Sequence, residues 1–169
     1  MSNSYVSAAF ALATTRAEAE LVRECVDLVN ALDDDVARKH HQRLRDGASK
    51  AFQRAFPPGE GGPLGTYLAL FDDADFPLFD CELDVTADHE TARLFFSGDQ
   101  MAVSAVAGLI QRTCKSALPC GFAYAWYSDR LRADEFGGGC FVIAADGIEN
   151  FNTHALLGRA LDQACESAA

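Results

Sequence analysis

Long hydrophobic runs are missing from this chain of 169 residues. No apolar stretch approaches the roughly 18 residues that a membrane-spanning helix needs. The apolar run from Tyr5 to Ala13 follows no basic segment, so we interpret it as a strand and not as a signal peptide. These absences predict a cytoplasmic protein that does not bind membranes.

Basic residues are also scarce, with 14 lysines and arginines against 25 aspartates and glutamates and a net charge of −11. Proteins that bind nucleic-acid backbone or anionic membrane unaided need clustered positive charge. The composition therefore argues against direct nucleic-acid binding. Hydrophobic residues make up 49% of the chain, which is enough apolar material for one ordinary globular domain.

Metal-binding and nucleophile motifs are absent too. The six cysteines show neither a C-x-x-C pair nor zinc-finger spacing, so we expect reduced cysteines that pack as small hydrophobic side chains. No G-x-S-x-G or S-x-x-K pattern supports a serine nucleophile. We therefore expect no metal site and no cofactor.

What the chain does contain is a strictly alternating stretch over residues 78–86. Its apolar set is Phe79, Cys81, Leu83 and Val85, and the alternate positions include Asp80, Glu82 and Asp84. A period of two predicts a half-buried strand whose acidic side chains face water. Folding this strand back on residues 91–97 predicts a hairpin with Leu83 opposite Leu94.

The other elements follow from local patterns. We expect a strand over 5–13, a helix from the capping box Thr15-Arg-Ala-Glu18, the hairpin, a helix after Gly98, strands over 120–128 and 140–145, and a helix after Asn152. This order predicts an α+β fold with a ferredoxin-like βαββαβ core and an additional C-terminal strand and helix. We expect an antiparallel-rich sheet with helices mainly on one face. Residues 1–169 then form a single domain, in which residues 36–68 are a helical and loop insertion.

A loop predicted over residues 129–139 is the first candidate site. Its candidate ligand-binding residues are Arg130, Arg132, Asp134, Glu135, Gly137, Gly138 and Gly139. The two arginines suit bidentate binding of a carboxylate or phosphate, and the two carboxylates suit a base or an orienting group. The three glycines permit close approach of a ligand to the backbone, although they precede a strand and not the helix of a phosphate-binding loop. A long connection that enters a central strand through a bulge is the plain alternative.

The second candidate is a partner surface made by Asp80, Glu82 and Asp84. Neighbouring carboxylates along one strand lie about 6.5–7 Å apart, too far for a metal or acid–base pair without a third group. A solvated sheet face, a surface for a basic protein and a catalytic role all stay open. Residues 38–54 hold six of the 14 basic residues, so docking of this segment on the acidic strand, within one chain or in a homo-oligomer, also stays open.

Two groups of residues carry a resemblance to a known family. They are Phe71-Asp-Asp with Phe76-Pro and Phe79, and the run Asp134-Glu-Phe-Gly-Gly-Gly139. On these motifs, residues 70–165 resemble small bacterial proteins, typical of phage- and plasmid-borne gene sets, that share an EFGGG motif. Cys140 stands where that family is expected to have alanine. The family has no known function, so the resemblance implies no activity, cofactor or catalytic residue.

These observations predict a cytoplasmic binding or interaction protein that takes a small anionic ligand at the 129–139 loop, or a basic protein on its acidic strand. One alternative is a small enzyme with Asp134 or Glu135 as acid or base and the two loop arginines as substrate clamps. Another is an acidic decoy of a mobile element that mimics nucleic acid.

Overall fold

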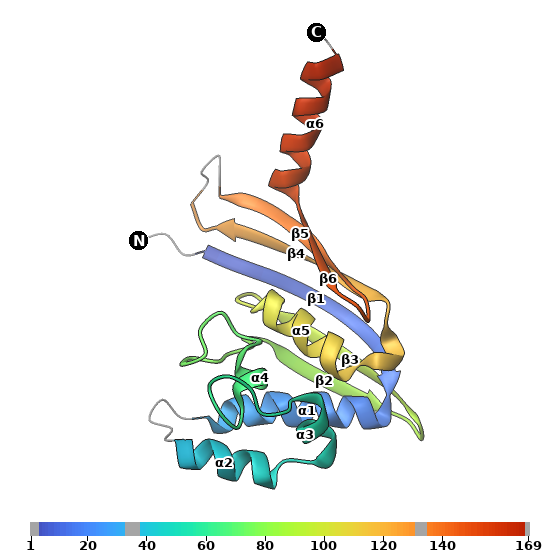
Figure 1. Cartoon of the computed structure of the whole chain (residues 1–169). Helices are drawn as coiled ribbons and strands as arrows, with labels where there is room; N and C mark the ends of the chain where they lie inside the picture. The colour runs from blue at the N-terminus through green and yellow to red at the C-terminus, as the bar shows by residue number, and fades with distance from the viewer. Residues whose placement is uncertain (1–3, 33–37, 131–134, 168–169) are drawn as a thin grey trace.

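A single sheet organises the molecule. The computed structural model describes residues 4–32, 38–130 and 135–167. Within them, the sheet has six strands in the order β2-β3-β1-β4-β5-β6, and the strand pairs are antiparallel (Figure 1). The strands are β1 (Ser4–Thr15), β2 (Glu82–Ala87), β3 (Thr91–Gly98), β4 (Cys120–Ser128), β5 (Phe136–Ile143) and β6 (Ile148–Asn152).

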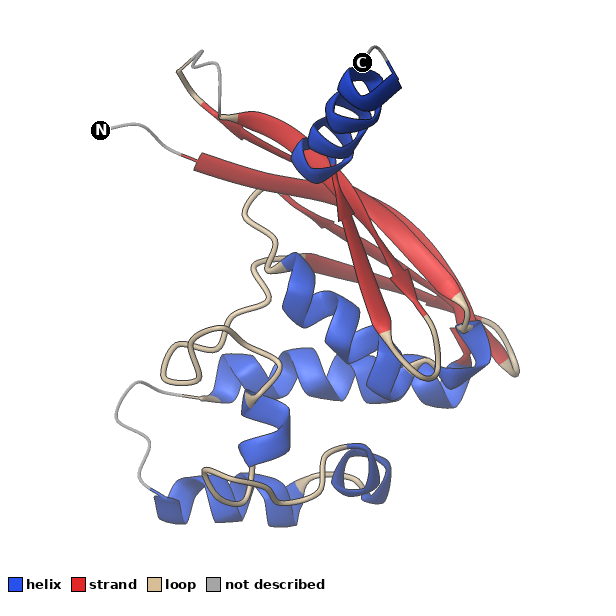
Figure 2. Ribbon diagram, turned by 45° about the horizontal axis from the view of Figure 1, so that its top comes forward, coloured by secondary structure: helices blue, strands red, loops and turns tan. Residues whose placement is uncertain are grey.

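Most helices lie on one side of this sheet. They are α1 (Arg16–Ala31), α2 (Arg38–Gly47), α3 (Lys50–Ala55), α4 (Gly65–Leu68), α5 (Val103–Thr113), the short 3-10 helix η1 (Lys115–Ala117) and α6 (Thr153–Ser167). Figures 1 and 2 show α1 to α5 on the same side of the sheet, with α1 and α5 next to it and α2 beyond α1, whereas α6 extends away from the sheet beyond β6. The predicted α+β class is therefore confirmed.

The finer topology differs from the prediction, which placed one further strand after the ferredoxin-like core. In the described part of the chain, two strands follow β4, and β6 forms the sheet edge. The strand order of the sheet as a whole is therefore not the predicted one. The physical reason lies in β6, because Ile148-Glu-Asn-Phe-Asn152 is largely polar and only its backbone pairing with β5 makes it a strand.

Helix α1 forms as its sequence predicts. The Thr15 hydroxyl accepts the backbone N–H of Glu18, and the Glu18 carboxylate accepts the backbone N–H of Thr15, which completes the predicted capping box. The helix turns an apolar stripe to the core. Its buried residues are Ala19, Leu21, Val22, Cys25, Leu28 and Val29.

Glu18 also joins α1 to the segment after α5. Its carboxylate accepts hydrogen bonds from the Ser116 N–H (2.9 Å), the Ser116 hydroxyl and the Thr14 hydroxyl. Burial alone would raise the pKa of Glu18, but the bonds from Ser116, Thr14 and Thr15 lower it from 4.5 to about 2. The ionised form of Glu18 therefore stabilises the fold.

The predicted hairpin exists, but its register is wrong by two residues. Leu83 lies opposite Phe96 and not opposite Leu94. The turn is tighter than predicted, because the Asp88 N–H donates to the Thr91 carbonyl (2.9 Å). A shift of two residues leaves each side chain on its predicted face, so the inward and outward sets are unchanged.

Residues 78–81, predicted as the start of this strand, take another path. The Phe79 carbonyl accepts the N–H of Ala102 (3.0 Å) beside α5, and Asp80 has a φ of 47°. Aspartate tolerates this left-handed conformation better than bulky residues do. The prediction that Asp80 belongs to the strand is therefore wrong, although its side chain is exposed, as are those of Glu82 and Asp84.

The core lies between the sheet and helices α1 and α5. Its buried strand residues include Leu12, Leu94, Phe96, Phe122, Phe141 and Ile143. On this covered face, Phe10 stacks on Phe122 with ring centroids 4.2 Å apart and on Phe96 at 5.1 Å. Full burial of one such large side chain is worth about 1.5–3 kcal/mol, so this layer holds the helices on the sheet.

The insertion of residues 36–68 supplies a second part of the core. Phe52, Phe56 and Tyr67 are fully buried, and their ring centroids lie 5.1–5.3 Å apart. Edge-to-face contacts at such distances are favourable because the positive ring edge meets the negative ring face. These three aromatics form one packed cluster.

Hydrogen bonds fasten this cluster to α1. The buried Tyr67 hydroxyl donates to the Cys25 carbonyl (2.5 Å), and burial raises the pKa of Tyr67. The Ser49 N–H and hydroxyl donate to the Glu24 carboxylate at 2.6 and 2.5 Å. Helix α1 is therefore the element on which the insertion packs.

Candidate binding surface

The predicted 129–139 loop is shorter in the structure, because β5 begins at Phe136. The glycines Gly137, Gly138 and Gly139 are therefore strand residues paired with β4, which corrects the prediction that they belong to the loop. The Ser128 N–H donates to the Glu135 carbonyl (3.2 Å) and closes the connection.

The glycine run has a structural role. A Cβ at Gly137 would lie 2.5 Å from the Trp126 indole, and a Cβ at Gly139 would lie 2.4 Å from the Phe151 carbonyl and 2.8 Å from the Tyr124 hydroxyl. Real Cβ atoms do not approach other atoms so closely. The glycines thus let the large rings of β4 lie across β5, and this role needs no ligand.

The charged residues of the same segment are only partly described. Arg130 lies just after β4, where its N–H donates to the Ser128 hydroxyl (3.4 Å), and Glu135 lies just before β5. Arg132 and Asp134 lie outside the described residues. Convergence of these side chains on an anion or a substrate therefore stays a prediction.

The acidic side chains of the first hairpin strand face solvent, and Asp80 and Glu82 help to line a hollow of about 510 Å³ beside β3. Among the residues that the structure describes, no three His, Cys, Asp or Glu side chains are grouped to hold a metal ion. The structure does not test whether Asp80, Glu82 and Asp84 form a surface for a basic protein, so that role stays a prediction.

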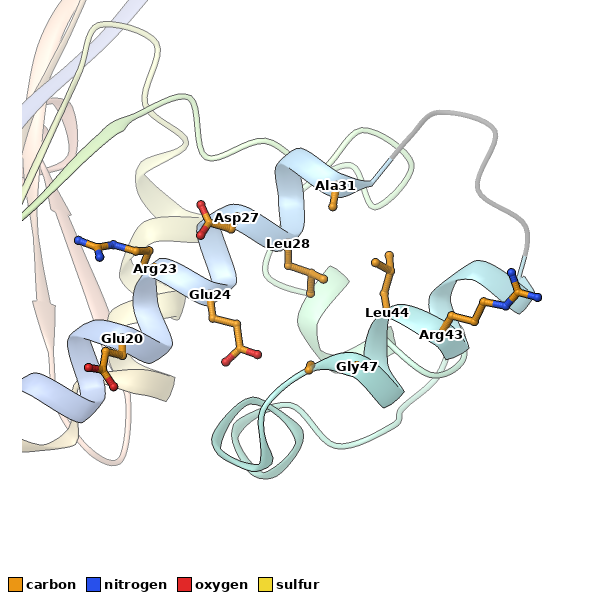
Figure 3. Close-up of a pocket in the computed structure, with 10 residues that line it drawn as sticks. Glu20, Arg23, Glu24, Asp27, Leu28, Ala31, Arg43, Leu44 and Gly47 are labelled. Carbon is orange, nitrogen blue, oxygen red and sulfur yellow. The ribbon is translucent and has the colours of Figure 1, made fainter.

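A second hollow, of about 540 Å³, lies between α1 and α2 (Figure 3). Leu28 and Leu44 point toward each other across it, and charged side chains stand around its rim. The rim carries both signs, from Glu20, Arg23, Glu24, Asp27 and Arg43. This hollow therefore favours neither an anionic nor a cationic ligand.

Burial argues against a nucleophilic role for Cys25, Cys81 and Cys114. Cys25 and Cys114 are buried, and the described cysteines are free. Burial raises the pKa of Cys81 and of Cys114 to about 11. Both side chains are therefore protonated thiols near neutral pH, which agrees with the prediction that they pack as small hydrophobic groups.

The face of the sheet opposite α1 and α5 carries many small and large apolar side chains. We call it the open sheet face. Its members alternate with the buried strand residues and are Ala9, Ala11, Ala13, Phe95, Gly121, Ala123, Ala125, Tyr127, Phe136, Cys140, Val142 and Phe151. Phe95, Tyr127, Phe136 and Val142 are 37–44% exposed. Exposed apolar surface of this kind is more typical of interaction sites than of an ordinary protein surface.

Charge is confined to other parts of this face. The outward positions of β1, β4 and β5 are Gly, Ala, Ser, Thr, Cys, Val or aromatic residues. The charged outward residues are Glu82 and Asp84 on β2, Arg93 on β3 and Glu149 on β6. The centre of the open sheet face is therefore uncharged.

Helix α6 leaves the sheet at the end of β6, and its first turn is fixed there against Trp126, whose ring lies on the face opposite the open sheet face. The Gly138 N–H donates to the Thr153 hydroxyl (3.2 Å), and the Asn152 side chain accepts the N–H of Ala155 (2.8 Å) as an N-cap. The His154 ring lies 5.1 Å from the Trp126 ring, and its Nε2 is 3.0 Å from the Phe136 carbonyl. The start of α6 is thus part of the fold.

Beyond that turn, α6 is exposed. Each side chain from Thr153 to Glu166 is classed as exposed, and Leu156, Leu157 and Leu161 are 48%, 62% and 57% exposed. The sequence predicted an apolar face on this helix, and the structure shows that its own chain leaves that face uncovered. The alanines at every second position of β1 and β4 were the available signal for the open sheet face, and sequence reasoning missed it.

None of the described helices has the length and apolar character needed to cross a membrane. No family model matches the chain, and no curated protein or solved structure matches it. The resemblance to phage- and plasmid-borne proteins therefore stays a prediction.

Proposed function

We propose that this chain is a polypeptide-binding protein whose binding surface is the open sheet face together with the apolar face of α6. One observation carries the proposal. Among the described residues, the exposed large apolar side chains gather mainly there: Phe95, Tyr127, Phe136, Val142, Leu156, Leu157 and Leu161. A partner that covers them removes apolar surface from water, which is the main driving force of protein association.

The shape of the surface favours a polypeptide over a small ligand. Small-molecule sites are concave and enclose most of the ligand. An exposed sheet face and a projecting helix instead form a wide, open surface that cannot enclose a small ligand. The uncharged centre suits a partner that brings apolar side chains. The predicted anion site near Arg130 is a separate proposal, and a small enzyme that uses Asp134 or Glu135 is its alternative.

We also propose a ferredoxin-like core made of β1 to β4 with α1 and α5, which β5 and β6 extend. The antiparallel pairing of β3 with both β1 and β2, and of β1 with β4, supports this reading. The free cysteines support a reducing compartment such as the cytoplasm.

Site-specific photocross-linking tests the proposed function. A benzophenone amino acid is placed at Val142 or Leu157 on the proposed surface, and at Glu20 on α1 or Asp46 on α2 as exposed controls, in cells that produce the chain. We expect covalent polypeptide adducts, with this chain or another, at the first two positions, and their loss when Leu161→Glu is added. Equal labelling at the control positions, or no adduct at Val142 and Leu157, would contradict the proposal.

A further inference from the structure

We propose that the polypeptide bound by this surface is a second copy of the chain, with α6 of each protomer packed on the open sheet face of the other. This inference rests on the proposed function and names the partner. Four features of the described residues carry it: the division of α6 into two halves, the size of the side chains on the sheet, the area available and the distribution of charge.

Helix α6 has an apolar side and a charged side along its whole length. At 100° per residue, one half of its circumference holds Leu156, Leu157, Ala160, Leu161, Ala164 and Cys165. The charged residues Arg159, Asp162 and Glu166 fall in the other half. A lone helix of about 12–15 residues is marginal in water, so α6 needs a surface against this apolar half.

Its own sheet does not supply that surface. The hydrogen bond from the Gly138 N–H to the Thr153 hydroxyl and the contact of His154 with Trp126 hold the first turn at β5 and β4. From there the axis of α6 points away from the sheet (Figure 1). The apolar half of α6 is thus presented to a neighbouring molecule.

The open sheet face matches that half in size. Ala9 and Ala11 on β1 and Ala123 on β4 form a floor of small side chains. Phe95 lies opposite Ala11 on one flank, and Val142 lies opposite Gly121 on the other. Large leucines from a helix fit between such flanks, because close packing places large side chains against small ones.

Area favours reciprocal exchange over a one-way contact. A helix of 15 residues is about 22 Å long and about 10 Å wide, so it covers about 220 Å² of sheet in projection. One contact buries two such surfaces, and a symmetric pair of contacts brings the projected total to about 900 Å². Corrugation of the side chains raises the accessible area further, toward the roughly 1,000 Å² or more of a specific interface. A second copy is the partner that doubles the contact by symmetry.

Charge agrees with this arrangement. Each copy carries a net charge of −11, so two copies repel each other over a distance. The centres of the two surfaces that meet are uncharged, and the nearest carboxylates on the sheet lie on its edge strands, with Asp84 opposite Phe95 and Glu149 opposite Val142. Salt screens the repulsion and leaves the apolar contact intact, so the dimer should tighten as ionic strength rises.

Sedimentation of the full chain from about 1 to 200 µM tests the inference. Leu161→Glu alters α6 and Ala123→Glu alters the sheet, with Ala11→Glu as a second sheet variant. Asp162→Asn, on the charged half of α6, is the matched control for a change of one charge. We expect a wild-type dimer, at least tenfold weaker association for each glutamate variant, and no change for the control. Circular dichroism confirms the fold of each variant.

Mixing identifies the contact. Equal amounts of the Leu161→Glu and Ala123→Glu chains should form a heterodimer, because one helix and the sheet that receives it are both unaltered. A helix–helix dimer predicts instead that Ala123→Glu has no effect, and that outcome would overturn the inference. A wild-type monomer at about 200 µM would also overturn it. In that case, photocross-links from Leu157 to another polypeptide would leave the proposed function standing, and their absence would remove both.

Discussion

Helices α1 and α6 have similar lengths, 16 and 15 residues, and each has one apolar half. The apolar half of α1 is buried, with Val22 and Cys25 fully enclosed, whereas Leu157 on α6 is 62% exposed. The amphipathic pattern therefore shows which side of a helix needs cover, but it does not show which molecule supplies the cover. For α1 the cover is the sheet and the insertion, and for α6 we propose a second chain.

The largest expected effect comes from truncating a leucine on α1. Leu28→Ala should lower the free energy of unfolding by about 2–4 kcal/mol at every protein concentration, because Leu28 is 9% exposed and its removal leaves a cavity. Leu157→Ala should change the free energy of unfolding by less than about 0.5 kcal/mol in dilute protein solution. The change should be larger in concentrated protein solution, because association then covers Leu157. Urea denaturation curves recorded at a low and a high protein concentration measure the effect of each substitution. Equal losses in dilute solution would show that α6 packs within its own chain.

The capping of α1 gives a pH-dependent prediction. Glu18 has its pKa lowered to about 2, so its stabilisation is fully present above the ordinary value of 4.5 and is lost as the pH falls toward 2. Glu18→Gln should cost about 1–2 kcal/mol at neutral pH, since solvent screens this partly exposed carboxylate, and the difference from wild type should shrink between pH 4.5 and 2.

Glu20 offers the matched control on the same helix. Its exposed ion pair with Arg16 spans 3.0 Å, so Glu20→Gln should change stability by less than about 0.5 kcal/mol. A difference between wild type and Glu18→Gln that stays constant across this pH range would show that the Ser116 bonds do not depend on the charge.

The glycines of β5 allow this strand to pair closely with β6, the strand that leads into α6. Gly139→Ala places a Cβ against the Phe151 carbonyl and should destabilise the pairing of β5 with β6 by about 1–3 kcal/mol. Gly147→Ala is the control, because no atom lies within 4 Å of a Cβ built there. Thermal unfolding of both variants measures the contrast. Similar stabilities would show that the glycine run serves something other than packing.

The smallest effect on stability is expected at the arginines. Arg130→Ala with Arg132→Ala should change the unfolding free energy by less than about 0.5 kcal/mol but abolish stabilisation by phosphate or citrate. Thermal shift with and without each anion measures this. If neither anion stabilises the wild type, the predicted anion site is wrong.

Local signals predicted the parts of the fold that local physics determines. Thr15 and Glu18 lie three residues apart, so the capping box was readable, and the alternation in residues 120–128 gave β4 its observed bounds. The hairpin register was wrong because hydrophobic alternation specifies faces, and a shift of two residues preserves them. The length of the turn, which decides between such registers, depends on a single backbone bond from Asp88.

The remaining features depend on contacts between distant residues. Phe52 and Tyr67 are 15 positions apart in the sequence and are in contact only in the folded chain. No hydrophobic periodicity in the sequence could therefore predict their cluster. Gly137 and Gly139, which were predicted as site residues, are glycines because a Cβ there would clash with the rings of Trp126 and Tyr124. A single sequence gives no sign that these residues are neighbours. The open sheet face was missed because its alanines look like ordinary small residues until the helices are placed.

Amide hydrogen exchange in α6, followed as the protein is diluted, tests the central claim most directly. We expect slow exchange for residues 155–166 in concentrated solution and fast exchange in dilute solution, while the amides of α1 remain protected throughout. Exchange in α6 that is the same at every concentration, whether slow or fast, would contradict the claim that another polypeptide covers this helix.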